Sequence, residues 1–248
     1  MKSKMIFVSF FSILLAVACS PTVETANPVE TIETEENNTT QSNQIESDSG
    51  VVDESGNSEA GSVAQSNLPF EDDYSNPNSG WDRAEWEEGF TDYVDGAYRM
   101  FVVPENYSIW ANPGLHFIDT SVTVVATKSS GHDDNEFGII CRYADIENFY
   151  AVTVSSDGFY GFLNIEDGTY GYLNMEEMQP TAAIVQGNST NTIRLDCIGN
   201  TLTLYVNGEY VAERVDDRIQ SGDVGLYAGT FAVPGTEILF DDFVVTAP

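Results

Sequence analysis

The stretch NTIRLDCIGNTLTLYVNG, residues 191–208, decides the fold class. Its apolar side chains recur at every second position: Ile193, Leu195, Cys197, Leu202, Leu204 and Val206. A period of two is typical of β-strands with one buried face. The pairs Gly-Asn and Asn-Gly that follow the two runs are turn residues. The stretch therefore predicts two antiparallel strands joined by a tight turn.

The same rhythm runs through residues 68–248. Residues 121–127 are β-branched and alternating, and turn sequences such as Ser156-Asp157-Gly158 separate strand-length segments. No window of twelve residues in this part has helical periodicity. Such alternation buries a core only between stacked sheets, so the sequence predicts an all-β sandwich or jelly roll. Residues 81–89 and 174–187 have the weakest strand signals and are interpreted as loops.

Three segments together suggest a family. Residues 191–208 resemble the late hairpin of concanavalin A-like lectin/glucanase domains, and residues 223–229, DVGLYAG, resemble their next strand. Residues 240–245, FDDFVV, are similar to their closing strand, which pairs near an opening strand such as 70–74. The nearest branches are laminin-G-like domains and the 3-keto-disaccharide hydrolase domain group. The resemblance implies a two-sheet jelly roll with a concave face that often holds sugar.

The first residues have the features of an export signal. Two lysines precede an apolar run from Met5 to Ala18, and Cys19 follows. Fourteen helical residues reach about 21 Å, which is short of a hydrocarbon core of about 30 Å. Residues 15–19, LAVAC, resemble the lipobox of bacterial lipoproteins, which implies a signal peptide over 1–18 and a lipid on Cys19. The alternative is an ordinary signal peptide cut nearby.

Residues 19–67 are predicted to be an acidic, disordered tether. They hold ten acids, no Lys or Arg, and no Phe, Tyr, Trp or Leu, so little apolar surface offsets the cost of ordering. Residues 68–248 hold the other 30 acids against seven bases, a formal charge of −23. Such charge excludes nucleic acid as a partner and disfavours polyanionic glycans. It leaves neutral sugars, cations or simple solubility.

Cys141 and Cys197 both fall on the apolar side of their predicted strands. An exported protein meets an oxidising compartment, where paired cysteines tend to bond. We predict a Cys141–Cys197 disulfide, and two buried free thiols are the alternative.

No catalytic residue is assigned. Related glucanases carry their carboxylates as Glu-x-Asp-x-(x)-Glu on one strand, and the nearest string here is Tyr143-Ala144-Asp145-Ile146-Glu147. Tyr143 stands where the first Glu would be, and Asp145 to Asn148 have the composition of a turn. The glucanase mechanism is therefore rejected for this string, and a glycoside-processing enzyme remains only as an alternative with an unidentified site.

A sugar presents an apolar C–H face, so a lectin site needs an exposed aromatic ring beside hydrogen-bonding groups. The predicted glycan-binding residues are Tyr160, Tyr170, Tyr172, Asn164 and Arg142. The first four belong to a hairpin predicted for residues 159–173. Trp81, Trp86 and Trp110 are further aromatic candidates. Packing in the core or on a sheet is the alternative for each ring, and a cross-strand ion pair is the alternative for Arg142.

Calcium is the predicted cofactor. In the family resembled, a calcium ion often joins the first and last strands, where Asp72 and Asp241 lie here. Charged edge strands that resist aggregation are the alternative.

The sequence thus predicts a membrane-anchored lipoprotein on the extracytoplasmic side of a bacterial envelope, presenting a sandwich that binds neutral glycan. A structural or adhesion module that binds an envelope protein is the competing interpretation.

Overall fold

The computed structural model describes residues 65–248, which contain sixteen strands and no helix. These residues belong to one compact unit. Within them nothing has the length and apolar character of a membrane-spanning helix. The predicted signal peptide, Cys19 and nearly all of the predicted tether lie outside the described residues.

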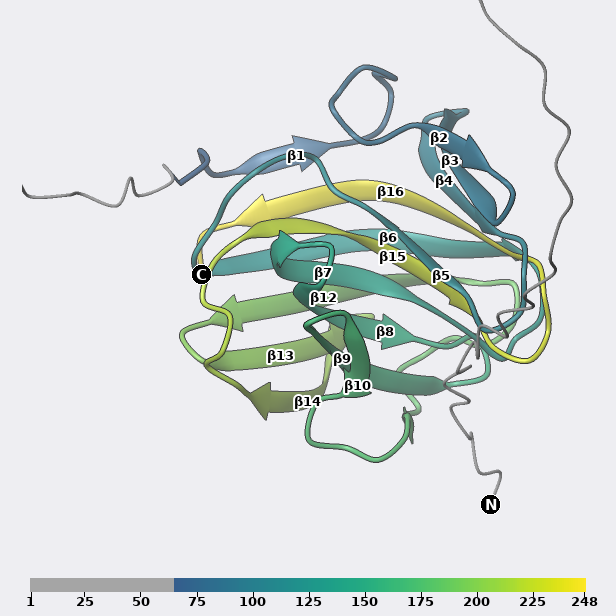
Figure 1. Cartoon of the computed structure of the whole chain (residues 1–248). Helices are drawn as coiled ribbons and strands as arrows, with labels where there is room; N and C mark the ends of the chain where they lie inside the picture. The colour runs from purple at the N-terminus through teal and green to yellow at the C-terminus, as the bar shows by residue number, and fades with distance from the viewer. Residues whose placement is uncertain (1–64) are drawn as a thin grey trace, which may run out of the picture. The chain divides into compact units, whose positions relative to one another are not determined.

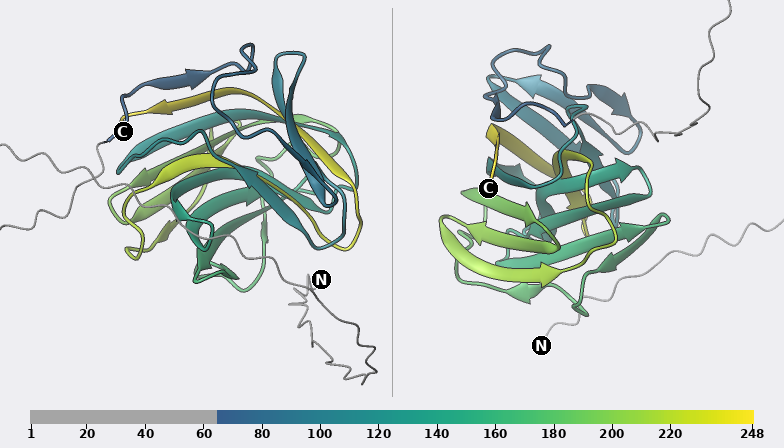
Figure 2. Two further views of the ribbon diagram at one scale, coloured as in Figure 1. Left: turned by 45° about the horizontal axis from the view of Figure 1, so that its top comes forward. Right: turned by 90° about the vertical axis from the view of Figure 1, so that its left-hand side faces the viewer.

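The strands form two antiparallel sheets that lie one over the other (Figures 1 and 2). The first sheet has nine strands. In spatial order they are β14 (Glu209–Val215), β13 (Thr201–Val206), β12 (Thr190–Ile198), β6 (Thr120–Ser130), β16 (Thr236–Thr246), β4 (Ala97–Val102), β3 (Gly89–Val94) and β2 (Ala84–Trp86), with β1 (Phe70–Asp72) paired to β16.

The second sheet has seven strands. In spatial order they are β10 (Thr169–Tyr172), β9 (Phe159–Glu166), β8 (Asn148–Val154), β7 (Asn135–Asp145), β15 (Asp223–Thr230) and β5 (Ser108–Ala111), with β11 (Gln179–Pro180) paired to β9. The main core fills the space between the sheets.

The hairpin predicted from residues 191–208 is present as β12 and β13. Ile193 pairs with Val206 and Cys197 with Leu202, so all six alternating apolar side chains share one face. All six are fully buried in the main core. The alternation therefore predicted both the strands and the face that packs inward.

The two predicted loops each contain a short strand, and there the prediction is wrong. Residues 81–89 include β2, whose three residues are all exposed at the edge of the larger sheet. Residues 174–187 include the two-residue β11. Neither strand has a buried face, so neither shows the alternation that marks a strand in sequence.

A disulfide joins Cys141 of β7 to Cys197 of β12, with the two Cα atoms 6.8 Å apart. The predicted pairing is therefore present. Because β7 and β12 belong to different sheets, the bridge links the two layers across the core.

The last strand, β16, occupies the middle of the larger sheet. It pairs with β6 along one side, and with β4 and then β1 along the other. Figure 1 shows β16 running between β1 and β6. Residues at the two ends of the described chain thus close the same sheet.

Candidate functional site

The outer face of the seven-stranded sheet carries a second apolar layer. Residues that point away from the main core are themselves buried there: Ile140, Phe149, Ala151, Leu163, Ile165 and Tyr227. An antiparallel sheet with one face in water would carry polar residues at such positions. Other parts of the protein therefore cover this face.

Four aromatic side chains, called here the aromatic cover, lie on this layer: Trp110 of β5, Tyr143 of β7, and Tyr170 and Tyr172 of β10. The rings of Trp110 and Tyr143 both lie 5.3 Å from the ring of Phe149. Tyr170 stands opposite Ile165 in the pairing of β10 with β9 and is 45% exposed. The cover thus presents aromatic surface to solvent over a buried apolar base.

A polar cluster lies at one end of the same face. The Tyr227 hydroxyl donates to Ser108 Oγ at 2.7 Å and approaches Glu136 Oε1 at 3.0 Å. Ser108 Oγ lies 3.3 Å from the same Glu136 oxygen. Glu136 is only 6% exposed. A buried carboxylate with two hydroxyls is able to exchange hydrogen bonds with a ligand that carries hydroxyl groups.

The charge of Glu136 in this cluster affects the two hairpin tyrosines, Tyr170 and Tyr172. Burial raises the pKa of Tyr170 to about 12, and the charge of Glu136 adds to the rise. Burial also raises the pKa of Tyr172, with further contributions from the charges of Glu136 and Asp134. Both phenols therefore lie in partly dry surroundings, and the charge of Glu136 acts on each of them.

The structure separates the residues predicted to bind glycan. Tyr172 and Tyr170 lie on the outer face, opposite Leu163 and Ile165. Tyr160 packs against the main core, and Asn164 has the same parity along β9. The hairpin therefore places Tyr160 and Asn164 on the reverse side from the aromatic cover.

Arg142 is a buried connector between loops. It lies at an irregularity in β7 with a φ of 53°, and it is 2% exposed. Its guanidinium donates to the carbonyl oxygens of Ile219 and Gly199 and pairs with Asp119. In this position Arg142 holds three segments together, and its guanidinium is not on the outer face.

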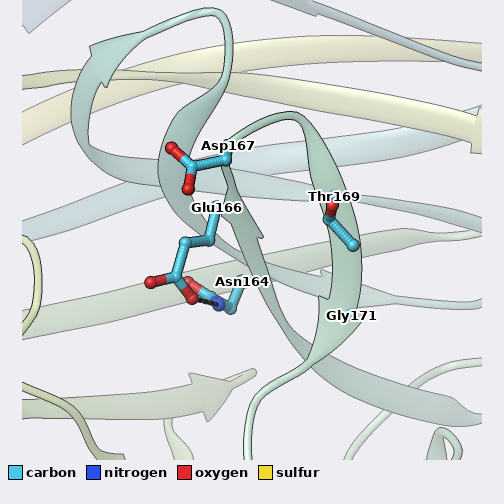
Figure 3. A pocket seen from close by; sticks show the side chains of 5 residues that line it. All are labelled: Asn164, Glu166, Asp167, Thr169 and Gly171. Atoms are coloured by element: carbon cyan, nitrogen blue, oxygen red, sulfur yellow. Dashed lines mark hydrogen bonds between the residues drawn. The ribbon is translucent and has the colours of Figure 1, made fainter.

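A shallow hollow of about 320 Å³ lies on the reverse side of the β9–β10 hairpin. Its lining comes from both strands and their turn: Asn164, Glu166, Asp167, Thr169 and Gly171 (Figure 3). Arg218 forms an ion pair with Glu166 there and lies 2.7 Å from Asp216 Oδ2. The hollow is polar and lacks an aromatic platform, so it suits sugar stacking less well than the outer face.

Asp72 and Asp241, the two residues predicted to bind calcium, lie on different strands, β1 and β16. Both oxygens of the Asp72 carboxylate accept hydrogen bonds, from the Tyr74 backbone N–H at 2.8 Å and from Trp81 Nε1 at 2.9 Å. Asp241 lies on β16 opposite Val125. Across residues 65–248 no group of three or more His, Cys, Asp or Glu side chains gathers as metal ligands do. Calcium binding stays a prediction.

Sequence reasoning missed the part of the outer face that β7 contributes. Glu136, Gly138 and Ile140 alternate with the core residues Phe137, Ile139 and Cys141 along β7. The signal was available in the alternation, since the residues between the core positions must point outward. It was hidden because Ile140 is as apolar as its neighbours.

Comparisons with known proteins bear on the fold. No protein-family model matches the sequence, and no curated protein does. Among solved structures, carbohydrate-binding module CBM66 from Bacillus subtilis has a TM-score of 0.53 at 14% identity, over 66% of this chain and 94% of its own. A Bacillus licheniformis β-glucanase has a TM-score of 0.52 at 12% identity, over 74% and 100%. A structure described as a native glycosidic hydrolase has a TM-score of 0.56 at 12% identity, over 74% and 97%.

The fold is therefore an all-β, two-sheet jelly-roll sandwich of the concanavalin A-like kind, shared with carbohydrate-binding and glycoside-hydrolase domains. At these identities the likeness concerns the arrangement of strands.

Proposed function

We propose that this protein is a membrane-anchored, extracytoplasmic lipoprotein whose sandwich binds a neutral glycan on the outer face of the seven-stranded sheet. The observation that carries the proposal is the aromatic cover beside a buried carboxylate. Aromatic rings stack on the C–H faces of sugars, and Glu136 with its hydroxyl partners supplies hydrogen bonds. The fold neighbours include a carbohydrate-binding module, which adds support from architecture.

A glycan array followed by calorimetry tests the binding function. Tyr170 is the exposed member of the cover, so Tyr170→Ala should weaken the Kd for the bound glycan about tenfold or more. Tyr210→Ala is the matched control, because Tyr210 is a 57% exposed tyrosine on β14 of the other sheet. Equal affinity in both variants, or an array without any binding, would overturn the proposal. In the latter case capture of an envelope protein would support the adhesion alternative.

The charge of residues 68–248 narrows the glycan class. A formal charge of −23 repels sulfated or uronic acid polymers. We expect binding to neutral glycans that varies little with salt, since no counterions need be released.

The anchor is tested by location. Cys19→Ala should move the protein from the membrane fraction to the soluble secreted fraction, because two acyl chains are what makes membrane attachment stable. Retention of the variant in the detergent phase would refute lipid attachment at Cys19.

Glycoside hydrolysis is a second candidate, favoured by two carboxylates at one place. Burial raises the pKa of Tyr172, and the charges of Glu136 and Asp134 both add to the rise. Glycosidases use a pair of carboxyl groups about 5–10 Å apart. Release of reducing ends from the bound glycan, abolished in Glu136→Gln, would establish this activity. Binding without release would limit the function to recognition.

A further inference from the structure

Thr153 is an unusual residue on the outer face of β8. Its neighbours Val152 and Val154 point into the main core, so the Thr153 side chain points outward. The residue is 0% exposed, and its Oγ1 has no hydrogen-bond partner within the described part of the chain. A buried hydroxyl without a partner destabilises the folded state, and such exceptions are few in native proteins.

Glycines flank Thr153 on both adjoining strands. Thr153 pairs with Gly138 of β7 and with Gly161 of β9. The backbone requires a glycine at position 138, because a Cβ there would lie 2.0 Å from the carbonyl oxygen of Val152. At Gly161 the constraint comes from side chains. A Cβ there would lie 2.9 Å from Tyr172 Cε1, 3.3 Å from Thr153 Oγ1 and 3.4 Å from Met178 Cγ.

Tyr172 is thus the side chain that lies over Gly161 and beside the Thr153 hydroxyl. Its ring edge occupies the space above Gly161, next to the Thr153 hydroxyl. Burial raises the pKa of its phenol, and the charges of Glu136 and Asp134 add to the rise. Tyr172 belongs to β10, a four-residue strand at the edge of the sheet, and among the strands of residues 65–248 it pairs with β9 alone. An edge strand held on one side is among the parts of a sheet that open at least cost.

We propose that Tyr172 is a displaceable cover over a binding subsite formed by Gly161, Thr153 and Glu136, which takes a hydroxyl or hydroxymethyl group of a neutral glycan. The inference rests on the proposed glycan-binding function and adds to it the position where one sugar edge enters. When the Tyr172 ring swings outward, the Thr153 hydroxyl gains the partner it lacks in the closed form. Gly161 keeps the entrance free, because any side chain there would fill it.

A subsite of this kind discriminates by hydrogen bonding. A sugar analogue that lacks the entering hydroxyl leaves the buried Thr153 hydroxyl without a partner, and sites built to hydrogen-bond a substrate hydroxyl reject deoxy analogues strongly. We expect the deoxy analogue at the recognised position to bind at least tenfold more weakly than the parent glycan.

The test compares stability and affinity in Thr153→Val, which keeps the shape of the side chain and removes the hydroxyl. The Tm should stay unchanged or rise, because an unpaired hydroxyl is removed, while the glycan Kd weakens tenfold or more. Thr203→Val is the matched control, since Thr203 is a partly exposed threonine on β13 of the other sheet, and its glycan Kd should not change.

Two further outcomes separate the inference from the function on which it rests. If the wild type binds a glycan and Thr153→Val binds it equally well, the subsite is refuted and the binding function stands. If the wild type binds no glycan, both fall. A lowered Tm in Thr153→Val would also overturn the inference, because the hydroxyl would then have a partner in the closed form.

Stopped-flow kinetics test the role of Tyr172 as a cover. Displacement of the ring before binding limits the fraction of competent molecules, so Tyr172→Ala should raise the association rate constant severalfold. Tyr172→Phe keeps the ring and should keep a rate close to that of the wild type. An unchanged association rate with faster dissociation in Tyr172→Ala would instead identify a fixed stacking platform and refute the cover.

Discussion

The two sheets differ in how their outer faces meet water. Strands of the larger sheet alternate between buried and partly exposed residues, as β6, β12 and β13 do along their whole length. Strands β8 and β15 of the smaller sheet, and β7 from Asn135 to Arg142, are buried at nearly every position. The contrast shows that the smaller sheet has a second layer on its outer face, and this layer is where the protein holds its candidate site.

The largest effect expected from this contrast is at Phe149. Phe149 lies on the outer face of the smaller sheet and yet is fully buried, so Phe149→Ala should destabilise the fold by about 3–5 kcal/mol, as in a true core. Urea denaturation measures the change. A loss below about 1 kcal/mol would mean that the outer layer is not packed, and the contrast between the sheets would disappear.

The disulfide joins β7 of the smaller sheet, which is buried on both faces, to β12 of the larger sheet, which has one face in water. Replacing Cys141 and Cys197 together by Ala should lower the free energy of unfolding by about 2–4 kcal/mol, because the bridge closes a loop of 56 residues. Denaturation under non-reducing conditions compares the variant with the wild type. If stability is unchanged, the core alone holds the two sheets together.

The stability of the protein should depend on pH through Asp223, which lies on β15, a strand that is buried on both faces. Burial raises the pKa of Asp223 to about 6, although backbone N–H groups of Leu115, Val224 and Gly114 donate to it. An acid whose pKa is raised by folding adds stability below its unfolded pKa near 3.8, and that stability is lost as the pH rises through about 6.

Asp223→Asn removes the charge, so its stability relative to the wild type should rise by on the order of 2 kcal/mol between pH 4 and pH 7. Thermal melts over this range measure the difference. A constant difference across the range would show that the Asp223 carboxylate is not desolvated.

The smallest effect is expected on the larger sheet. The Arg194 guanidinium lies 3.7 Å from the centre of the Tyr205 ring on its half-exposed outer face. Such exposed cation–π contacts contribute about 0.5–1 kcal/mol, so Arg194→Ala should cost no more than that in urea denaturation. A loss comparable to that of Phe149→Ala would indicate that the outer face of the larger sheet is also covered.

This contrast also explains what the sequence could predict. The hairpin β12–β13 was predicted with its buried face because one of its faces meets water and is therefore polar. On the smaller sheet both faces are apolar, so a strand such as β8 gives no sign of which residues lie outside. The jelly-roll fold could be predicted from the strands that have one polar face. The candidate site lies on the strands that are apolar on both faces.

The predicted glycan residues were divided for two local reasons. The turn after Glu166 pairs Tyr170 with Ile165 and Gly171 with Asn164, so neighbouring polar and aromatic candidates point to opposite sides. For Arg142, counting alternate residues from the core residue Cys141 would place the side chain on the outer face. The irregularity in β7 between Cys141 and Asp145 interrupts that count, and Arg142 turns into the loops instead.

The central position of β16 has a consequence for how the protein is made. Until residues 236–246 leave the ribosome, β6 and β4 have no neighbour on the sides where β16 belongs. The larger sheet cannot close before that moment, because three of its pairings, with β1, β4 and β6, are made by β16 to distant parts of the chain. Before that moment the edges of β6 and β4 that face β16 are unpaired, and unpaired strand edges are sites where partly made chains aggregate.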